Sequence, residues 1–194
     1  MVEHEGKLKL ERVAAAAEAA NGDERKARAL PPVHLWNPTY VGEIDIVIRK
    51  DGSWVHEGGV IGREALVRLF STILRKDPDG TYLVTPVEKL RVTVEDAPFV
   101  AVRVDRDGPA LRFVTNVGDE VEAGPEHPIR VDLGAGGEPR PYVHVRAGLE
   151  ALLSRPVFYE LVELAEERPS ATGTELGVAS NGAWFPLGRA EAAP

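Results

Sequence analysis

The chain of 194 residues contains no cysteine. This absence excludes disulfides, iron–sulfur clusters, thiolate zinc sites and cysteine nucleophiles. The sequence also lacks any uncharged apolar run near the roughly 18 to 20 residues that cross a bilayer, and its start, Val2-Glu3-His4-Glu5, is acidic where a secretory signal is basic. We therefore expect a cytoplasmic protein that does not enter a membrane and is long enough for two small domains.

The chain has fewer basic than acidic residues, and its net charge is −8. The acidic excess falls in residues 96–194, which carry nine basic and sixteen acidic side chains. Because neutralised phosphates supply most of the affinity for bulk nucleic acid, broad coating of DNA or RNA is not expected. Every basic residue after Lys89 is an arginine, which allows a local anion pocket and is explained equally well by arginine-rich codon usage.

The motifs of the common enzyme classes are absent as well. There is no Gly-x-x-x-x-Gly-Lys phosphate loop, no His-Glu-x-x-His or His-x-His pair, and no Gly-x-Ser-x-Gly nucleophile turn. The stretch Asp77-Pro78-Asp79-Gly80 lacks the further ligands of a calcium loop and is interpreted as a turn. The sequence thus predicts no catalytic residue, no metal and no cofactor, and it leans against an enzyme.

The spacing of apolar residues predicts many short elements. Residues 1–32 are expected to form a helix-prone or disordered tail. The expected helices are 63–74, 147–153 and 154–167, and the expected strands are 43–49, 54–56, 81–85, 89–95, 99–105, 111–117, 128–133 and 142–146. This order predicts an α+β protein with mainly antiparallel sheets, divided into an N-terminal domain over residues 33–95 and a C-terminal domain over residues 96–194.

One hairpin signature, Asp/Asn-Gly-x-Trp-x-x-x-Gly, occurs at residues 51–58 and again at 181–188. It indicates either a duplicated core or convergence on one favourable turn. A two-residue turn in the first copy makes Arg49 face Trp54, Ile48 face Val55 and Val47 face His56. Trp54, Arg49 and His56 then share one face, as a recognition surface or as cover for the interface with the other unit.

The second copy is expected to differ in its surface. There the same two-residue turn places Trp184 over Gly177 and Ala179, whose small side chains let the indole lie flat on the sheet. Trp184 is therefore expected to be structural.

Several motifs together resemble one bacterial family. They are Trp36-x-Pro38, Asp51-Gly52-x-Trp54-x-His56-x-Gly58, Glu95-Asp96-Ala97-Pro98-Phe99, Thr115-Asn116, His127-Pro128 and Pro141-Tyr142-x-x-Val145-Arg146. With them the chain resembles the family of unknown function DUF1285 from about Val33 to Leu164, with Val60 standing where proline is expected. The resemblance implies a duplicated architecture, a C-terminal half similar to pleckstrin-homology-like folds, and a site between the halves for a nucleotide or nucleic-acid-based ligand.

Our leading hypothesis from the sequence is a ligand-binding regulatory module, with a possible role in signal transduction. In it, aromatic and polar residues contact the ligand, and basic residues neutralise its charge. The candidate residues are Trp36, Arg49, Trp54, His56, Arg63, Lys89, Asn116 and Arg146. The alternative is a protein–protein adaptor without a small-molecule ligand, since pleckstrin-homology-like halves often present a strand edge or a groove to a peptide.

Overall fold

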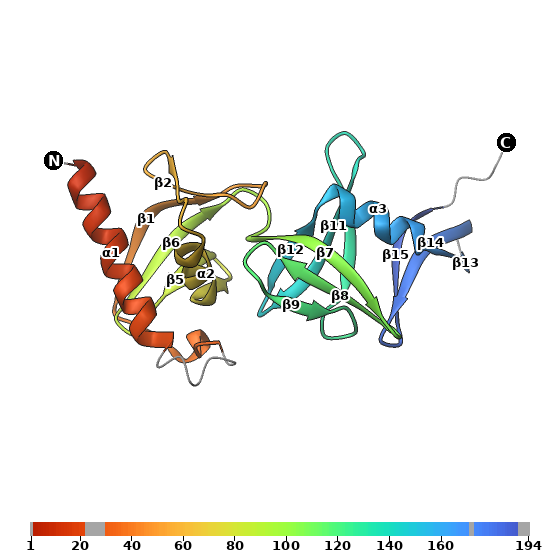
Figure 1. Cartoon of the computed structure of the whole chain (residues 1–194), viewed down its shortest axis with the longest axis horizontal. Coiled ribbons are helices and arrows are strands. Elements are labelled where there is room, and N and C mark those ends of the chain that lie inside the picture. Colours follow the sequence, from red (N-terminus) through yellow and green to blue (C-terminus); the bar gives the residue numbers. More distant parts are fainter. Residues whose placement is uncertain (1, 22–29, 171–172, 190–194) are drawn as a thin grey trace. The chain divides into compact units, whose positions relative to one another are not determined.

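The chain forms two compact units, Met1–Pro98 and Phe99–Pro194, shown in Figure 1. The computed structural model describes residues 2–21, 30–170 and 173–189. The unit boundary lies three residues beyond the 95/96 boundary expected from the sequence. Helices combine with sheets whose strand pairs are mostly antiparallel, which confirms the expected α+β class.

The N-terminal unit is built on a six-stranded sheet with the order β3-β2-β1-β6-β5-β4. Its two central strands, β1 and β6, run parallel, and the other neighbours are antiparallel. The strands are β1 (Tyr40–Ile48), β2 (Trp54–His56), β3 (Gly59–Val60), β4 (Leu74–Asp77), β5 (Gly80–Val84) and β6 (Glu88–Val94). A short 3-10 helix, η2 (Val33–Leu35), lies against β4.

Two helices complete this unit. Helix α2 (Glu64–Thr72) buries Phe70, whose ring stacks on Trp54 with the centroids 6.4 Å apart. Helix α1 (Val2–Asn21) lies beside α2 (Figure 1) and buries Val13 and Ala17. The stretch expected to be a tail therefore contributes a packed helix over residues 2–21, and residues 22–29 of that stretch lie outside the described residues.

The first hairpin has a three-residue turn, so the register predicted from the sequence is wrong. Gly52 N donates to Arg49 O, Arg49 N donates to Ser53 O, and Gly52 has a φ of 84°. This is a tight turn followed by a left-handed glycine, which adds one residue to the loop. Ile48 consequently pairs with Trp54, and the one-residue shift moves Trp54 onto the isoleucine face.

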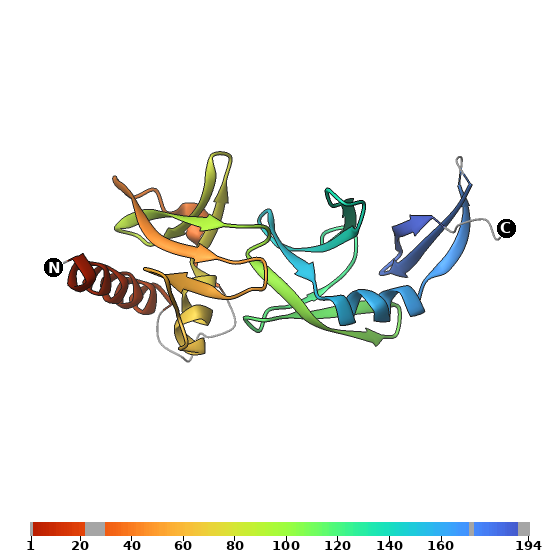
Figure 2. The same ribbon diagram turned by 90° about the horizontal axis from the view of Figure 1, so that it is seen from above.

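The C-terminal unit contains a second six-stranded sheet, ordered β10-β11-β12-β7-β8-β9, and a three-stranded sheet, β13-β14-β15. The strands of the larger sheet are β7 (Phe99–Asp107), β8 (Ala110–Thr115), β9 (Glu120–Glu122), β10 (Ile129–Leu133), β11 (Pro139–Arg146) and β12 (Leu149–Leu153). Helix α3 (Arg155–Glu163) lies along β7 in the views of Figures 1 and 2. The smaller sheet comprises β13 (Glu166–Ser170), β14 (Gly173–Ser180) and β15 (Ala183–Arg189).

The helix predicted over residues 147–153 is wrong, because this segment is strand β12. Ala147 and Gly148 both have positive φ and make a tight turn from β11, after which Leu149, Ala151 and Leu153 are buried at every second position. The helix predicted to reach residue 167 ends at Glu163, and β13 follows it.

The duplication is visible in the order of the strands. Reading the second large sheet from β9 to β10 gives 9-8-7-12-11-10, which matches 3-2-1-6-5-4 in the first sheet strand for strand. The counterpart of the β1–β2 hairpin is therefore β7–β8, whose turn carries Asp107-Gly108. The match of Asp51-Gly52 with Asn181-Gly182 is a likeness of turns alone, since β14 and β15 belong to the additional small sheet.

The β14–β15 hairpin does have the two-residue turn expected from the sequence. Asn181 and Gly182 have φ values of 46° and 77°, as a type I′ turn requires. Trp184 pairs with Ala179, and a Cβ on Gly177 would lie 2.6 Å from the indole. The prediction that Trp184 lies over these two small residues is confirmed.

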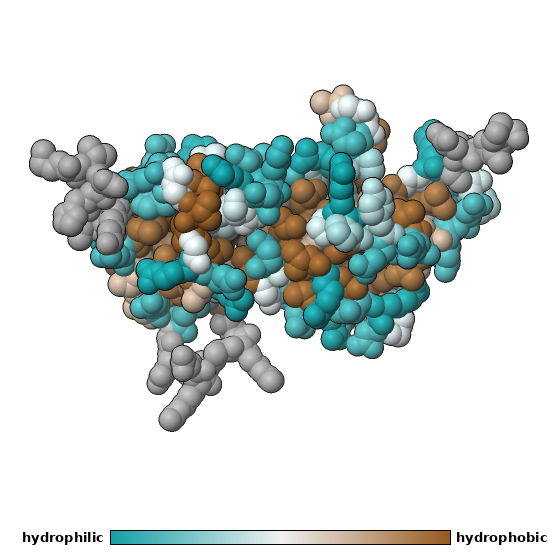
Figure 3. Space-filling model, turned by 45° about the horizontal axis from the view of Figure 1, so that its top comes forward, coloured by the Kyte–Doolittle hydropathy of each residue, from teal (hydrophilic) through white to brown (hydrophobic). Residues whose placement is uncertain are grey.

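Among the described residues, no helix has the length and apolar character needed to cross a membrane. On the face shown in Figure 3, polar residues predominate and smaller apolar patches occur on each unit.

Candidate functional site

Trp54 lies in the core of the N-terminal unit and not beside Arg49 as predicted. Its side chain is 1% exposed, and its indole N–H has no hydrogen-bond partner within the described part of the chain. His56 shares the face of Trp54 and is half-buried, with Nδ1 2.8 Å from the carbonyl oxygen of Asp45. Arg49 is exposed on the hairpin turn. The structure therefore separates Trp54 from the solvent-accessible surface that a stacking ligand would need.

Lys89 and Trp36 belong to a cluster of paired charges around Asp77. Lys89 Nζ lies 2.6 Å from an Asp77 oxygen and 3.9 Å from the centre of the Tyr82 ring. Arg75 donates to both oxygens of Asp77 and, at 2.7 Å, to the carbonyl of Trp36. Burial alone would raise the pKa of Asp77, but the hydrogen bonds from Arg75 and Lys89 outweigh it and lower that pKa. The cluster fixes Trp36 through its backbone and neutralises Lys89.

Arg146 and Asn116 make contacts inside the C-terminal unit. Arg146 Nη1 lies 2.5 Å from an Asp119 carboxylate oxygen, and its guanidinium lies 4.9 Å from the centre of the Phe99 ring. The Asn116 side chain accepts a hydrogen bond of 2.9 Å from the backbone N–H of Val100. Both residues thus stabilise the fold locally, and their part in ligand binding stays a prediction.

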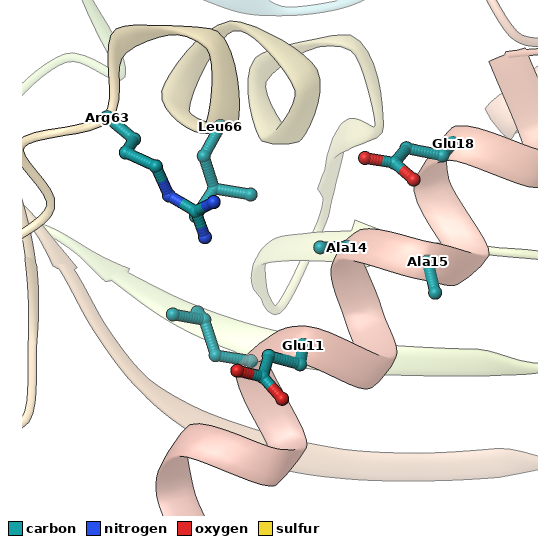
Figure 4. Close-up of a pocket in the computed structure, with 7 residues that line it drawn as sticks. Glu11, Ala14, Ala15, Glu18, Arg63 and Leu66 are labelled. Atoms are coloured by element: carbon teal, nitrogen blue, oxygen red, sulfur yellow. The ribbon is translucent and has the colours of Figure 1, made fainter.

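Arg63 lines a cavity of about 150 Å³ between α1 and α2 (Figure 4). Its guanidinium points toward α1, where Glu11 and Glu18 project from the same side of the helix. The salt bridges found in the described ranges do not include Arg63. With two carboxylates and one guanidinium, this cavity has no net attraction for a phosphate.

A larger groove of about 430 Å³ lies in the C-terminal unit, next to strand β9. Its volume falls in the range of roughly 300 to 1,000 Å³ that ligand sites occupy. Three glutamates and one histidine give it its polar character, and no lysine or arginine lines it. The lining residues are Glu120, Val121, Glu122, Gly124, Pro125, Glu126, His127, Val145 and Asn181.

The hydrogen bonds of the groove leave several acceptors available. Glu122 pairs with Arg112 at 2.9 Å, whereas the side chains of Glu120 and Glu126 make no ion pair in the part of the chain described. His127 Nδ1 lies 3.1 Å from a carbonyl oxygen. Because a carbonyl only accepts, this nitrogen carries the proton in the neutral ring, which leaves Nε2 as an acceptor.

Strand β9 is an edge strand of its sheet, and its register leaves some of its backbone groups pointing away from β8. One hydrogen bond lies on each side of β9. Thr115 N donates to Asp119 O and Ala123 N donates to Leu111 O, both at 2.9 Å. Since bonded pairs alternate along antiparallel strands, Val121 bonds to β8, and the N–H and C=O groups of Glu120 and Glu122 point away from it. Such an edge is a template for one further strand.

The β14–β15 turn closes one end of this groove. Ser180 Oγ accepts from Leu111 N and donates to Ala123 O, both at 2.8 Å. Asn181 Nδ2 donates to the same carbonyl at 3.0 Å. The turn is therefore fixed to β8 and to the end of β9, so the groove is preformed.

The groove combines an unpaired strand edge with carboxylate and imidazole acceptors, which suits an extended segment carrying cationic side chains. No cluster of three or more metal-ligating side chains occurs among the residues that the structure describes. None of the candidate residues chosen from the sequence lines this groove. The signals for it were the acidic excess of residues 96–194 and the motif His127-Pro128, neither of which located a groove.

Comparison with known proteins gives one family. The family model described as "Domain of unknown function (DUF1285), N-terminal domain" matches residues 31–97, and that described as "Protein of unknown function (DUF1285), C-terminal domain" matches residues 98–187. No curated protein matches the chain.

Two solved structures are similar. A DUF1285 family protein from Silicibacter pomeroyi DSS-3 is 47% identical, with a TM-score of 0.80, over 91% of this chain and 94% of that one. A DUF1285 family protein from Shewanella baltica OS155 is 30% identical, with a TM-score of 0.50, over 61% of this chain and 90% of that one. These matches confirm the resemblance predicted from the motifs.

Proposed function

The chain belongs to the DUF1285 family, and from its geometry we propose that it is a cytoplasmic adaptor that binds an extended, basic segment of a partner protein. The segment adds to the edge of β9 as a further strand, and its lysine or arginine side chains contact the glutamates of the groove. Binding of this kind suits a regulatory role in signal transduction. The observation that carries the proposal is the acid-lined groove beside an unpaired strand edge.

Charge supports a cationic occupant over a nucleotide. The β9 groove is lined by Glu120, Glu122 and Glu126 without any lysine or arginine, so it repels phosphate groups. The α1–α2 cavity holds two carboxylates against Arg63 alone. The nucleotide ligand expected from the sequence stays a prediction, and these two cavities favour the adaptor that was its alternative.

The first test measures binding of an end-capped six-residue peptide of alternating arginine and valine to the full chain by calorimetry. We expect saturable binding that weakens as salt rises, because exposed charges are screened. The variant Glu120→Gln/Glu126→Gln should weaken binding by about tenfold, at roughly 0.5 to 1 kcal/mol for each exposed pair lost. The matched control is Glu160→Gln/Glu163→Gln on α3, which removes the same charge outside the groove and should bind like the wild type.

A second variant separates strand addition from simple charge attraction. Glu120→Pro removes an N–H that points away from β8, so it should abolish peptide binding at little cost to the fold. Glu120→Gln keeps that N–H and should lose only part of the affinity. Equal binding by the two variants, or saturable binding of ATP without any binding of the peptide, would refute the proposal.

A further inference from the structure

The N-terminal unit buries one carboxylate that its fold does not require. Glu88, the first residue of β6, is 4% exposed. Among the residues whose side chains the structure describes, it is the only charged one that is buried. In the duplicated sheet the same place, directly after the two-residue turn that opens the sixth strand, is held by Leu149, which is 2% exposed. A leucine satisfies this position, so the glutamate serves a further contact.

That contact is an arginine on α1. Arg12 Nη2 lies 2.9 Å from Glu88 Oε2. The other oxygen, Oε1, is buried without a hydrogen-bond partner in the ranges that the structure describes. A carboxylate accepts two parallel bonds from one guanidinium in its preferred geometry. In the present pairing, therefore, only one of the two carboxylate oxygens of Glu88 accepts a hydrogen bond.

The contact between α1 and α2 is incompletely packed as well. The small side chains of Ala14 and Ala15 leave the cavity of about 150 Å³ against Arg63 and Leu66 of α2 (Figure 4). A void of this size forfeits dispersion contacts that a larger aliphatic side chain would make. Among residues 9–21 of α1, whose side chains the structure describes, only Val13 and Ala17 are fully buried.

We propose that the seat between α2 and the start of β6 is a receptor for an amphipathic helix of a partner protein, and that α1 occupies it within the chain until such a helix replaces it. The partner helix carries an arginine at the place of Arg12, which bonds both oxygens of Glu88. It carries a leucine-sized side chain at the place of Ala14, which fills the cavity. This seat is separate from the β9 groove, and the two proposals stand or fall independently.

The physical basis is competition between an attached and a free helix. Because α1 is part of the chain, its effective concentration at the seat is high, on the order of millimolar for a short connection. A free helix binds measurably only when it fits better than α1 or when the attachment of α1 is weakened. The unused oxygen of Glu88 and the cavity beside Ala14 are the two places where a better fit is available.

The test uses a fluorescein-labelled peptide of residues 2–21 carrying Ala14→Leu, added to the full chain. The chain variant Arg12→Ala/Val13→Asp weakens the attachment of α1. We expect it to bind the peptide at least about tenfold more tightly than the wild type does, because the seat is open in a larger fraction of molecules. Adding Glu88→Leu, the residue of the duplicated sheet, should weaken peptide binding by at least about tenfold while the unit stays folded.

The outcomes are separable. If the double variant does not melt cooperatively, Arg12→Ala alone replaces it, and the same result is expected. Equal affinity with and without Glu88→Leu, or no saturable binding by either weakened chain, would overturn the proposal. Sedimentation that shows a wild-type dimer lost in Arg12→Ala would assign the seat to α1 of a second copy and would also overturn it.

Discussion

Replacing Trp54 by alanine should destabilise the N-terminal unit strongly, because the indole is part of its core. Trp54 is 1% exposed, pairs with Ile48 across the hairpin and stacks on Phe70. Removing a fully buried aromatic side chain costs about 3 to 5 kcal/mol, from lost burial and from the cavity that remains. In a unit of this size the melting temperature should fall by roughly 12 °C or more. Trp54→Phe should cost about 1 kcal/mol, since it keeps a ring on Phe70 and removes an unsatisfied N–H.

The assay is urea unfolding followed by far-UV circular dichroism, a probe that every variant retains. Trp36→Ala is the matched control, because its half-buried side chain should cost about 1 kcal/mol or less. A Trp54→Ala variant within about 0.5 kcal/mol of the wild type would refute the observed register and restore Trp54 to the surface face predicted from the sequence.

Two further predictions concern hydrogen-bonded polar groups, one in each unit. The pKa of Asp77 lies below its ordinary value of 3.8 in the folded chain, so its pairing stabilises the fold above that value, and this contribution disappears as the pH falls through the folded pKa. Asp77→Asn should therefore cost about 1 to 3 kcal/mol at pH 7 and progressively less as the pH falls below the ordinary value of 3.8 in urea unfolding, and a cost that does not change over this range would contradict this. Ser180→Ala should cost about 1 to 3 kcal/mol in the C-terminal unit, followed by Trp184 fluorescence, because it leaves the buried N–H of Leu111 without its acceptor. Ser154→Ala, whose side chain makes no capping bond, should stay within about 0.5 kcal/mol, and equal losses in the two variants would rule out the proposed anchoring of the hairpin.

The sequence predicted the elements of the fold where one periodicity dominated. Helix α2 and strands β5, β6, β7, β8 and β10 follow from apolar spacing, with boundaries shifted by up to two residues, whereas the three-residue strand β9 was not predicted. The segment 147–153 was predicted wrongly, because a short apolar run fits a helix and a buried strand alike. The segment forms a strand because Ala147 and Gly148 make a left-handed turn before it. The sequence does not indicate this turn, because alanine rarely adopts a positive φ.

The candidate site was harder to predict because it depends on register and on the docking of a turn that is distant in the sequence. One extra residue in the turn at Asp51-Gly52 moved Trp54 from a surface to the core, and the dipeptide alone does not fix the loop length. The β9 groove gathers Glu120, His127 and Asn181 from three separate segments. Their proximity follows from the docking of the β14–β15 turn, which no local pattern in the sequence announces.

The most direct test of the adaptor proposal is hydrogen exchange at the backbone of β9 with and without the arginine–valine peptide. The amide of Val121 is bonded to β8 in the register observed and should be protected in both states. The amides of Glu120 and Glu122 point away from β8, so they should exchange fast in the free chain and become protected when the peptide adds as a strand. Unchanged exchange at Glu120 and Glu122 under saturating peptide would contradict the account.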